Sequence, residues 1–246
     1  MKFKFRYVLI GLAAILLLAV GGFVVWAANP LGPEEQALVA LESDELVSVS
    51  RGEFIVFKPT DIDPETGLIF YPGGRVDYRS YAPALREIAA DGYLVVLIPA
   101  PLNLMVFAPD KADEVIPQYP HVVHWAVGGH SLGGAMAAQY AGGHVDKVEG
   151  LLLWASYPAS NNDLSESGLK VLSIYGTLDM GGMQPFDDSR ALLPANTTWL
   201  VIEGGNHAQF GDYGSQPGDN PATISAADQQ AQVVSATVEF LDALDD

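Results

Sequence analysis

The chain has 246 residues, with 12 Lys or Arg, 30 Asp or Glu and no cysteine, and its formal net charge at pH 7 is −18. The lack of cysteine excludes disulfides, thiol nucleophiles and zinc sites built on thiolates. A strongly acidic surface repels nucleic acid and other polyanions, so we expect no nucleic-acid partner and favour neutral or cationic small substrates.

The first predicted element is an uncharged apolar run of 21 residues, Val8–Ala28, that follows three basic residues. As a helix this run would be about 32 Å long, close to the roughly 30 Å thickness of a bilayer core. We therefore expect residues 1–28 to form a retained membrane anchor. The alternative is a signal peptide with Val25 and Ala27 at its cleavage site, which would give a secreted protein.

The charge of the chain divides unevenly between this segment and the remainder. Three of the 12 basic residues, Lys2, Lys4 and Arg6, precede the apolar run, which leaves 9 basic against 30 acidic residues, a net charge of −21, in the remainder. A basic flank stays in the cytoplasm, so everything after the anchor is expected to be extracytoplasmic.

After the anchor, residues 29–46 are predicted to form a tether with one short helix, and residues 47–246 a single domain. The predicted strands lie within residues 47–59 (as a hairpin), 67–74, 93–101, 121–129, 148–158, 169–179 and 197–207, some of which run on into the following loop. The predicted helices are 78–92, 110–120, 132–143 and 225–244. Continuous apolar strands that alternate with helices indicate an α/β fold, in which helices cover both faces of a mostly parallel sheet.

The pattern Gly-His-Ser-Leu-Gly at residues 129–133 joins a predicted strand to a predicted helix. Ligands bind beyond the carboxyl ends of the strands in such sheets, and Ser131 lies at that edge. Glycines on both sides allow a tight turn that exposes the serine hydroxyl, while the helix directs its first amides at the same point. We therefore expect Ser131 to be a nucleophile; the alternative is a glycine-rich packing turn with an incidental serine.

A serine nucleophile needs a histidine base and an acid that orients the base. Of the two histidines after Ser131, His144 falls at the opposite edge of the sheet and His207 falls just past the last strand, so His207 is the expected base. Asp179, just past the preceding strand, is the expected acid. Its rivals are Asp163 in a polar loop, and Asp187 and Asp188, which helix capping would explain.

The negative oxygen that forms on a substrate during attack must be met by two backbone N–H groups. The first should come from Leu132, the residue after the nucleophile. The second should come from the loop after strand 67–74, that is from Gly74 or Arg75. Arg75 could instead bind a substrate carboxylate, or lie on a solvated helix face.

Together, Ser131, Asp179, His207 and the loop at residues 73–74 resemble the α/β-hydrolase superfamily. "YPGGRVDYRSYAPALREIAADGYLVVLIPAPLN", "GGHSLGGAMAAQYA" and "GGNHAQFGDYG" resemble a subgroup of small bacterial esterases similar to dienelactone hydrolase. The resemblance implies a Ser131 nucleophile, a His207 base, an Asp179 orienter and amide donors at Leu132 and Gly74. The chain departs from many relatives in having Pro72, where they carry His before the glycines.

Only 48 positions separate Ser131 from Asp179, and 28 separate Asp179 from His207, so no room remains for a large lid domain. We therefore predict an open site and a serine hydrolase of small carboxylic esters that needs no metal and no cofactor. The alternatives are a non-catalytic binding or scaffolding module with the same fold, or an acyltransferase. Trp154, Met180, Met183 and Phe186 are candidates for the acyl pocket or, equally, for the core. The sequence leaves the oligomeric state open.

Overall fold

The computed structural model describes residues 2–244, so Met1 of the predicted anchor and residues 245–246 of the predicted domain lie outside the described residues. Eight strands form one sheet in the order β1-β2-β4-β3-β5-β6-β7-β8. Pairing is parallel from β4 to β8, whereas β2 is antiparallel to both β1 and β4. The strands are β1 Val47–Arg51, β2 Ile55–Pro59, β3 Thr66–Tyr71, β4 Leu94–Leu97, β5 His124–His130, β6 Gly150–Trp154, β7 Lys170–Gly176 and β8 Thr198–Ile202.

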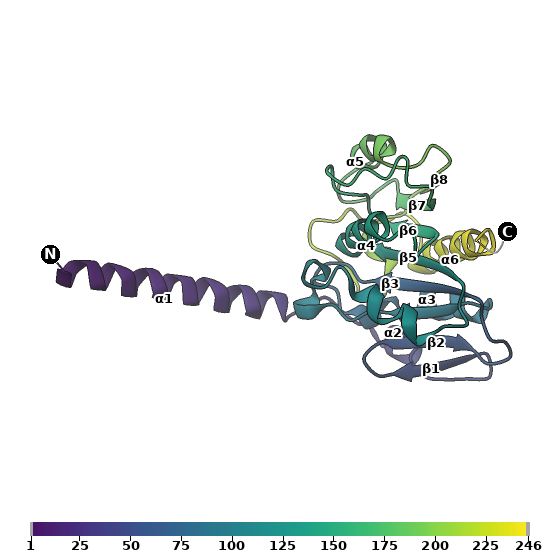
Figure 1. The fold of residues 1–246 in the computed structure, drawn as a ribbon, viewed down its shortest axis with the longest axis horizontal. Helices are drawn as coiled ribbons and strands as arrows, with labels where there is room; N and C mark the ends of the chain where they lie inside the picture. The colour runs from purple at the N-terminus through teal and green to yellow at the C-terminus, as the bar shows by residue number, and fades with distance from the viewer. Residues whose placement is uncertain (1, 245–246) are drawn as a thin grey trace.

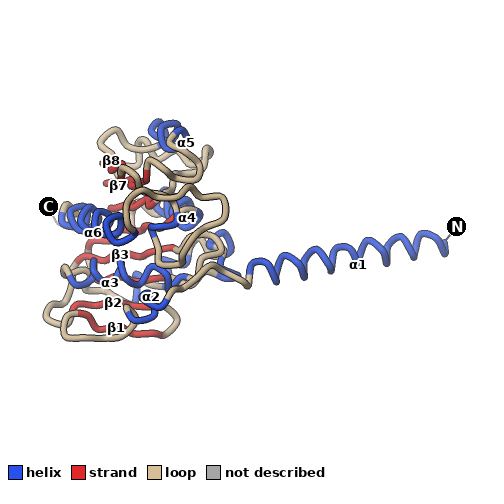
Figure 2. Tube along the Cα trace, turned by 180° about the vertical axis from the view of Figure 1, so that it is seen from behind, coloured by secondary structure: helices blue, strands red, loops and turns tan. Residues whose placement is uncertain are grey.

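Helices cover both faces of the sheet, which confirms the predicted α/β fold class (Figures 1 and 2). Two apolar clusters form the core, one with the buried side chains of α3 and α6 and the other with those of α4. The helices are α1 Lys2–Ala27, α2 Glu35–Val39, α3 Ala82–Ala90, α4 Leu132–Gly143, α5 Gln184–Ser189 and α6 Ala226–Asp242. The central strands β3 and β4 are buried at every position, because parallel strands are covered on both sides.

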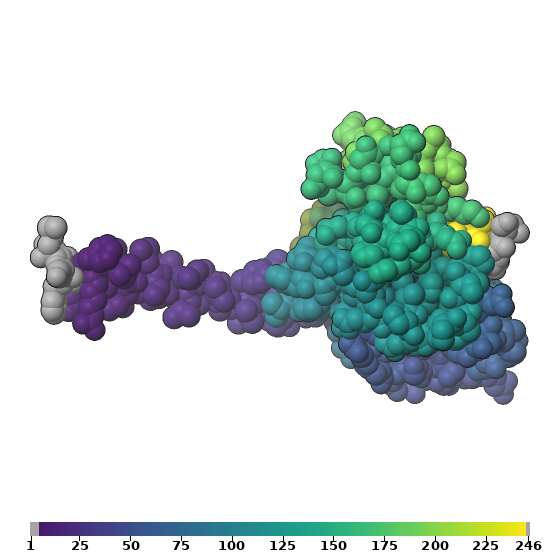
Figure 3. All heavy atoms as spheres, in the orientation of Figure 1, coloured from purple at the N-terminus to yellow at the C-terminus, as the bar shows by residue number. Residues whose placement is uncertain are grey.

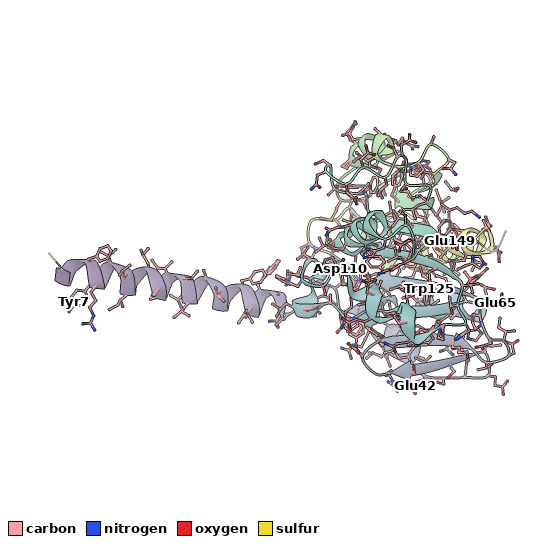
Figure 4. All side chains as sticks on the ribbon, viewed as in Figure 1. Tyr7, Glu42, Glu65, Asp110, Trp125 and Glu149 are labelled. Carbon is pink, nitrogen blue, oxygen red and sulfur yellow. The ribbon has the colours of Figure 1, made fainter. Side chains whose placement is uncertain are left out.

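The parallel strands give the sheet two distinct ends. Glu65 and Glu149, which precede β3 and β6, lie at the amino edge of these strands, far from α1 (Figure 4). Asp110 lies toward the other end, from which α1 projects. The carboxyl ends of the parallel strands, and therefore the loops that carry ligand-binding residues in such folds, are at the α1 end.

Helix α1 extends away from the rest of the chain as a single rod (Figure 1). Its segment Phe5–Ala27, 23 residues with a mean hydropathy of 2.9, is long and apolar enough to cross a membrane, and none of its most apolar window is buried. A signal sequence near the N-terminus would have the same properties.

The segment after α1 packs on the domain. Leu31 pairs with Val76 as a parallel bridge, and its N–H donates to the carbonyl of Arg75 at 2.8 Å. Ala37 of α2 and Leu41 are buried. Residues 29–46, predicted to be a tether, therefore share contacts with the core.

The predicted helix at 110–120 is wrong. The chain instead makes two short 3₁₀ turns there, η4 (Lys111–Glu114) and η5 (Ile116–Gln118). Pro117 lacks the N–H that a continuing α-helix would use, which explains the interruption. No range was predicted for the short helix α5; the sequence indicated only a helix start near Asp187 and Asp188, and both residues lie inside the helix rather than at its cap.

Helix α4 lies unusually close to the sheet because its first turn contains glycine. A Cβ at Gly133 would lie 2.3 Å from the carbonyl oxygen of Tyr71 and 2.4 Å from that of Pro72, closer than real contacts allow. Gly143 at the other end of α4 has nothing within 4 Å of the same position. Contact between helix and sheet therefore demands glycine at one end of α4 only.

We predict that Gly133→Ala destabilises the protein by about 1–3 kcal/mol, because the strand carbonyls cannot move aside cheaply. Thermal unfolding in detergent should shift down by about 2–4 °C per kcal/mol. Gly143→Ala is the matched control and should leave the midpoint unchanged or raised, since alanine favours helix. Equal effects of the two substitutions would contradict this packing argument.

A buried histidine and tyrosine connect the β3 loop to β5. The Gly73 N–H donates to the Tyr81 hydroxyl at 3.0 Å, and that hydroxyl bonds to Nδ1 of His130 at 2.8 Å. Burial raises the pKa of Tyr81, so its hydroxyl keeps its proton and can donate to His130. Burial, and secondly the neighbouring His207, holds the pKa of His130 well below its usual value of 6.5. The folded protein therefore holds His130 neutral.

Because His130 is neutral in the folded protein, the free energy of unfolding should decrease as pH decreases. Below a pH of about 6.5 the unfolded chain gains a proton at His130 that the folded chain does not, so stability is lost as pH falls, by at most about 1.4 kcal/mol per pH unit. His130→Gln should flatten the dependence of the free energy of unfolding on pH between 6.5 and 5. His124→Gln, at the exposed amino edge, is the control and should retain more of that slope; an unchanged slope in His130→Gln would refute the assignment.

Candidate active site

Ser131 occupies a strained turn between β5 and α4. Its φ is 52° and its ψ is −122°, a region that residues other than glycine rarely adopt. The Ser131 N–H donates to the carbonyl of Trp154 at 2.9 Å, and the Ser156 hydroxyl donates to the Ser131 carbonyl at 2.6 Å. Both bonds come from β6 and the loop after it, so the neighbouring strand holds the serine at the carboxyl edge.

His207 and Asp179 form a buried pair at the same edge. Nδ1 of His207 lies 2.8 Å from Oδ2 of Asp179, and the two residues are 5% and 3% exposed. The other oxygen, Oδ1, accepts from the N–H of Gly181 at 3.1 Å. Of the aspartates considered from the sequence, Asp179 is therefore the one that meets His207, whereas Asp163 instead accepts from the N–H of Ser165.

Ser131, Asp179 and His207 line one cavity of about 350 Å³. Its other lining residues are Leu132, Ala135, Ala155, Ser156, Tyr157, Met180, Gly181, Pro185 and Phe186. Nε2 of His207 is buried and has no hydrogen-bond partner, so the bond from Ser131 to His207 is not made in this structure. Among the described residues, none makes a hydrogen bond to that nitrogen.

The two expected amide donors lie side by side. A Cβ on Gly74 would lie 2.9 Å from Cδ2 of Leu132, which places the β3 loop against the start of α4. The Gly73 N–H is bonded to Tyr81 and the Arg75 N–H to the carbonyl of Asn103 at 2.7 Å. This leaves the N–H of Gly74, rather than that of Arg75, available to a ligand, although Gly74 does not line the cavity itself.

The guanidinium of Arg75 has a partner that the sequence did not indicate. Its Nε donates to the carbonyl of Trp26 at 3.0 Å, and Nη2 donates to the carbonyl of Asn29 at 2.8 Å. It also lies over the Trp26 ring, 4.3 Å from the centroid. Arg75 therefore holds the end of α1, a contact that neither of the roles considered from the sequence included.

The residues proposed for an acyl pocket separate into two groups. Met180 and Phe186 line the cavity, whereas Trp154 is fully buried in the core and Met183 does not line the cavity. His144 stacks on Tyr140 at the amino side of the domain, away from Ser131.

Three polar residues that the sequence analysis missed hold the loop of His207. Gln229 of α6, fully buried, accepts from the Asn206 N–H at 3.0 Å and donates to the Asn206 carbonyl at 2.8 Å. Asp219 accepts from the N–H of Ala208 at 2.8 Å. Asn220 donates to the carbonyls of Leu178 and Asp179 at 3.1 and 3.2 Å. The loop at 210–225 thus links Asp179 to the segment of His207. The clustered Asp and Asn of this loop are the one signal of these contacts in the sequence.

No group of three or more His, Asp or Glu side chains arranged to hold a metal ion occurs in the described part of the chain.

Comparison with known proteins places this geometry in a family. Residues 67–231 match the alpha/beta hydrolase family. No curated protein matches the chain significantly in sequence.

Several solved structures share the fold. A thermostable esterase from Pseudomonas putida ECU1011 is 16% identical, with a TM-score of 0.56 over 87% of this chain and 91% of that chain. The dienelactone hydrolase from Anabaena variabilis ATCC 29413 is also 16% identical, with a TM-score of 0.56 over 82% and 98%. Esterase 2 from Thermogutta terrifontis, phosphoramylated by tabun, is 14% identical, with a TM-score of 0.55 over 81% and 97%. At these identities the likeness establishes the fold that the sequence predicted. The match over residues 67–231, more than half of the chain, shows that this protein belongs to the alpha/beta hydrolase family.

Proposed function

We propose that the chain is a serine hydrolase of small carboxylic esters, with Ser131 as nucleophile, His207 as base and Asp179 as orienter. The observation that carries the proposal is the buried 2.8 Å contact between His207 Nδ1 and Asp179 Oδ2. It orients the imidazole so that Nε2, which has no other partner, can take a proton in the cavity that Ser131 lines.

In the proposed reaction, Oγ of Ser131 attacks the ester carbonyl carbon while its proton passes to Nε2 of His207. The N–H groups of Leu132 and Gly74 stabilise the negative oxygen of the tetrahedral intermediate. As the carbon–oxygen bond to the alcohol breaks, His207 returns the proton to the departing alcohol. Water, activated by the same imidazole, then hydrolyses the acyl-enzyme and frees Ser131.

The proposal places residues 1–28 in the membrane as an anchor and the hydrolase domain, residues 47–246, on its outer face. The apolar length of α1 and the basic residues before it support that arrangement. Ester hydrolysis is favoured over a scaffolding role because Ser131 keeps the strained conformation that exposes a nucleophile, and strain is retained where it serves function. Acyl transfer would use the same acyl-enzyme. The two reactions differ in whether water or another acceptor attacks the acyl-enzyme.

The labelling experiment uses the full chain in detergent with a fluorophosphonate probe, which reacts covalently with activated serines. We expect one label, on Ser131 by peptide mass spectrometry, and none in Ser131→Ala. Ser156→Ala is the matched control, since Ser156 lines the same cavity; it should still be labelled at Ser131. A wild-type chain that stays unlabelled would favour the scaffolding alternative, and a label on Ser156 would contradict the assignment of Ser131 as nucleophile.

The role of the acid is tested with Asp179→Asn, which keeps the shape of the side chain but removes the charge that stabilises the imidazolium. We expect kcat for p-nitrophenyl acetate to fall about 10³-fold or more. Asp163→Asn removes an equal charge from a surface loop and should leave kcat unchanged. Similar kcat values for the two variants would contradict a catalytic role for Asp179.

A further inference from the structure

The end of α1 is attached to the same sheet edge as the candidate active site. Arg75 follows β3 and Asn103 follows β4, and both bond to backbone carbonyls of the segment Trp26–Asn29. Ser131 follows β5, which pairs with β3. Because neighbouring strands are about 4.8 Å apart, the helix is attached roughly one strand away from the nucleophile.

The attachment is a firm joint rather than a free linker. Asn103 donates to the carbonyl of Ala27 at 2.9 Å, and its own carbonyl accepts from the Arg75 N–H at 2.7 Å. The side chain of Arg75 stacks on Trp26 and bonds to the Trp26 carbonyl, which the helix leaves open at its C-terminal end, and to the Asn29 carbonyl just beyond the helix. Ala27 is fully buried. The direction in which α1 leaves the domain is therefore set by these contacts.

An uncharged loop surrounds the joint. Residues 98–109, IPAPLNLMVFAP, contain no charged side chain, in a part of the chain whose net charge is −21. Three of its apolar side chains are exposed, Leu102 by 39%, Val106 by 45% and Phe107 by 54%. We call these three residues the collar. Figure 3 shows the teal atoms of this part of the chain against the purple end of the helix.

The backbone of the loop that carries the collar is strained at one turn. Leu102 has a φ of 52° and Asn103 a φ of 55°, in the left-handed region. Such a conformation costs a leucine on the order of 1 kcal/mol or more. The strain turns the chain at η2 (Pro101–Asn103), so that an apolar side chain remains exposed beside α1.

The height of the collar along α1 can be fixed from one ring contact. The rings of Phe107 and Phe23 meet edge to face with centroids 6.4 Å apart. Phe23 is four residues before the end of the apolar segment Phe5–Ala27, which is about 6 Å along a helix. If α1 spans a bilayer, Phe107 reaches the depth at which interfacial apolar side chains lie, about 5–10 Å.

We propose that the collar lies in the lipid interface of the membrane that α1 crosses, so that the carboxyl edge of the sheet, with Ser131, faces the bilayer. This proposal rests on the proposed ester hydrolysis. The substrate is then an ester of a short acyl group with a membrane amphiphile, and the enzyme reaches it from the lipid surface. The cavity of about 350 Å³ receives the short acyl group while the apolar part of the amphiphile stays in the membrane. The exposed Met180 and Tyr157 at the cavity lie on the same edge.

The orientation is tested without any catalytic readout. The chain has no cysteine, so single cysteines can carry a fluorophore without background. The full chain with Leu102→Cys or Phe107→Cys is labelled with a nitrobenzoxadiazole dye and reconstituted in phosphatidylcholine vesicles containing shallow doxyl-labelled lipid. Val123→Cys and Val145→Cys, exposed by 60% and 51% near the amino edge, are the controls.

We expect at least twofold quenching by the doxyl lipid at positions 102 and 107 and none at 123 and 145. Absence of quenching at 102 and 107, or equal quenching at all four positions, would overturn the orientation. The orientation would also be overturned if the dye at position 107 became shielded from water only when other membrane proteins are present. That result would assign the collar to a protein partner. Cleavage of the chain near Ala27 in cells would also overturn the orientation.

The substrate class is tested by comparing two acetates. Acetate release from hexadecyl acetate in the vesicles should fall at least tenfold in Phe107→Asp, while the rate with water-soluble p-nitrophenyl acetate stays unchanged. Val123→Asp should alter neither rate. Equal rates of wild type and Phe107→Asp on hexadecyl acetate would overturn the proposed substrate. A wild-type chain inactive on both acetates would instead count against the proposed function, and the quenching result would still decide the orientation.

Discussion

At Ser131 the backbone turns through a φ of 52°, and the close approach of α4 to β3 and β5 keeps it there. Gly129 and Gly133 make this approach tolerable, since a Cβ on either would lie within 2.6 Å of backbone atoms. The strain is confined to Ser131, but the packing that offsets it is the contact of α4 with three strands, β3, β5 and β6. The orientation of the serine hydroxyl, the free amide of Leu132 and the position of Gly74 all depend on this one contact between helix and sheet.

The histidine side of the site is held by different means. His207 lies in a loop, where the backbone lacks the regular bonds of a strand or helix. Buried Gln229 replaces them by bonding both the N–H and the carbonyl of Asn206, and the Asp219 carboxylate accepts from the N–H groups after Asn206. A buried amide with both of its polar atoms bonded fixes a peptide as firmly as a strand partner would. His207 is therefore positioned by α6 and by the long loop before it.

The parts of this arrangement that the sequence could predict are those set by local pattern. Apolar runs identified the central strands, the glycine spacing identified the turn at Ser131, and position after a strand distinguished His207 from His144, because strand ends and sheet edges follow from the alternation of elements. The structure brings Asp179 to His207, and its catalytic role stays a prediction.

What the sequence could not predict are contacts between segments distant along the chain. Gln229 lies 23 residues from Asn206, and Arg75 lies 46 residues from Asn29. A polar side chain gives no sign in the sequence of which carbonyl it will meet. The predicted helix at 110–120 was wrong for a local reason, because Pro117 lies inside it and proline interrupts a regular helix.

The β3 loop is where the anchor and the site are physically joined. The N–H of Gly73 is held from the core by Tyr81, and Arg75 is held from outside by the end of α1. Gly74, between them, has neither bond and keeps its N–H free. Without α1, the Arg75 guanidinium and the Asn103 amide would lose the carbonyls of Trp26 and Ala27 as partners. The helix therefore acts as a structural part of the domain as well as a candidate membrane span, which is why its direction and the orientation of the site are linked.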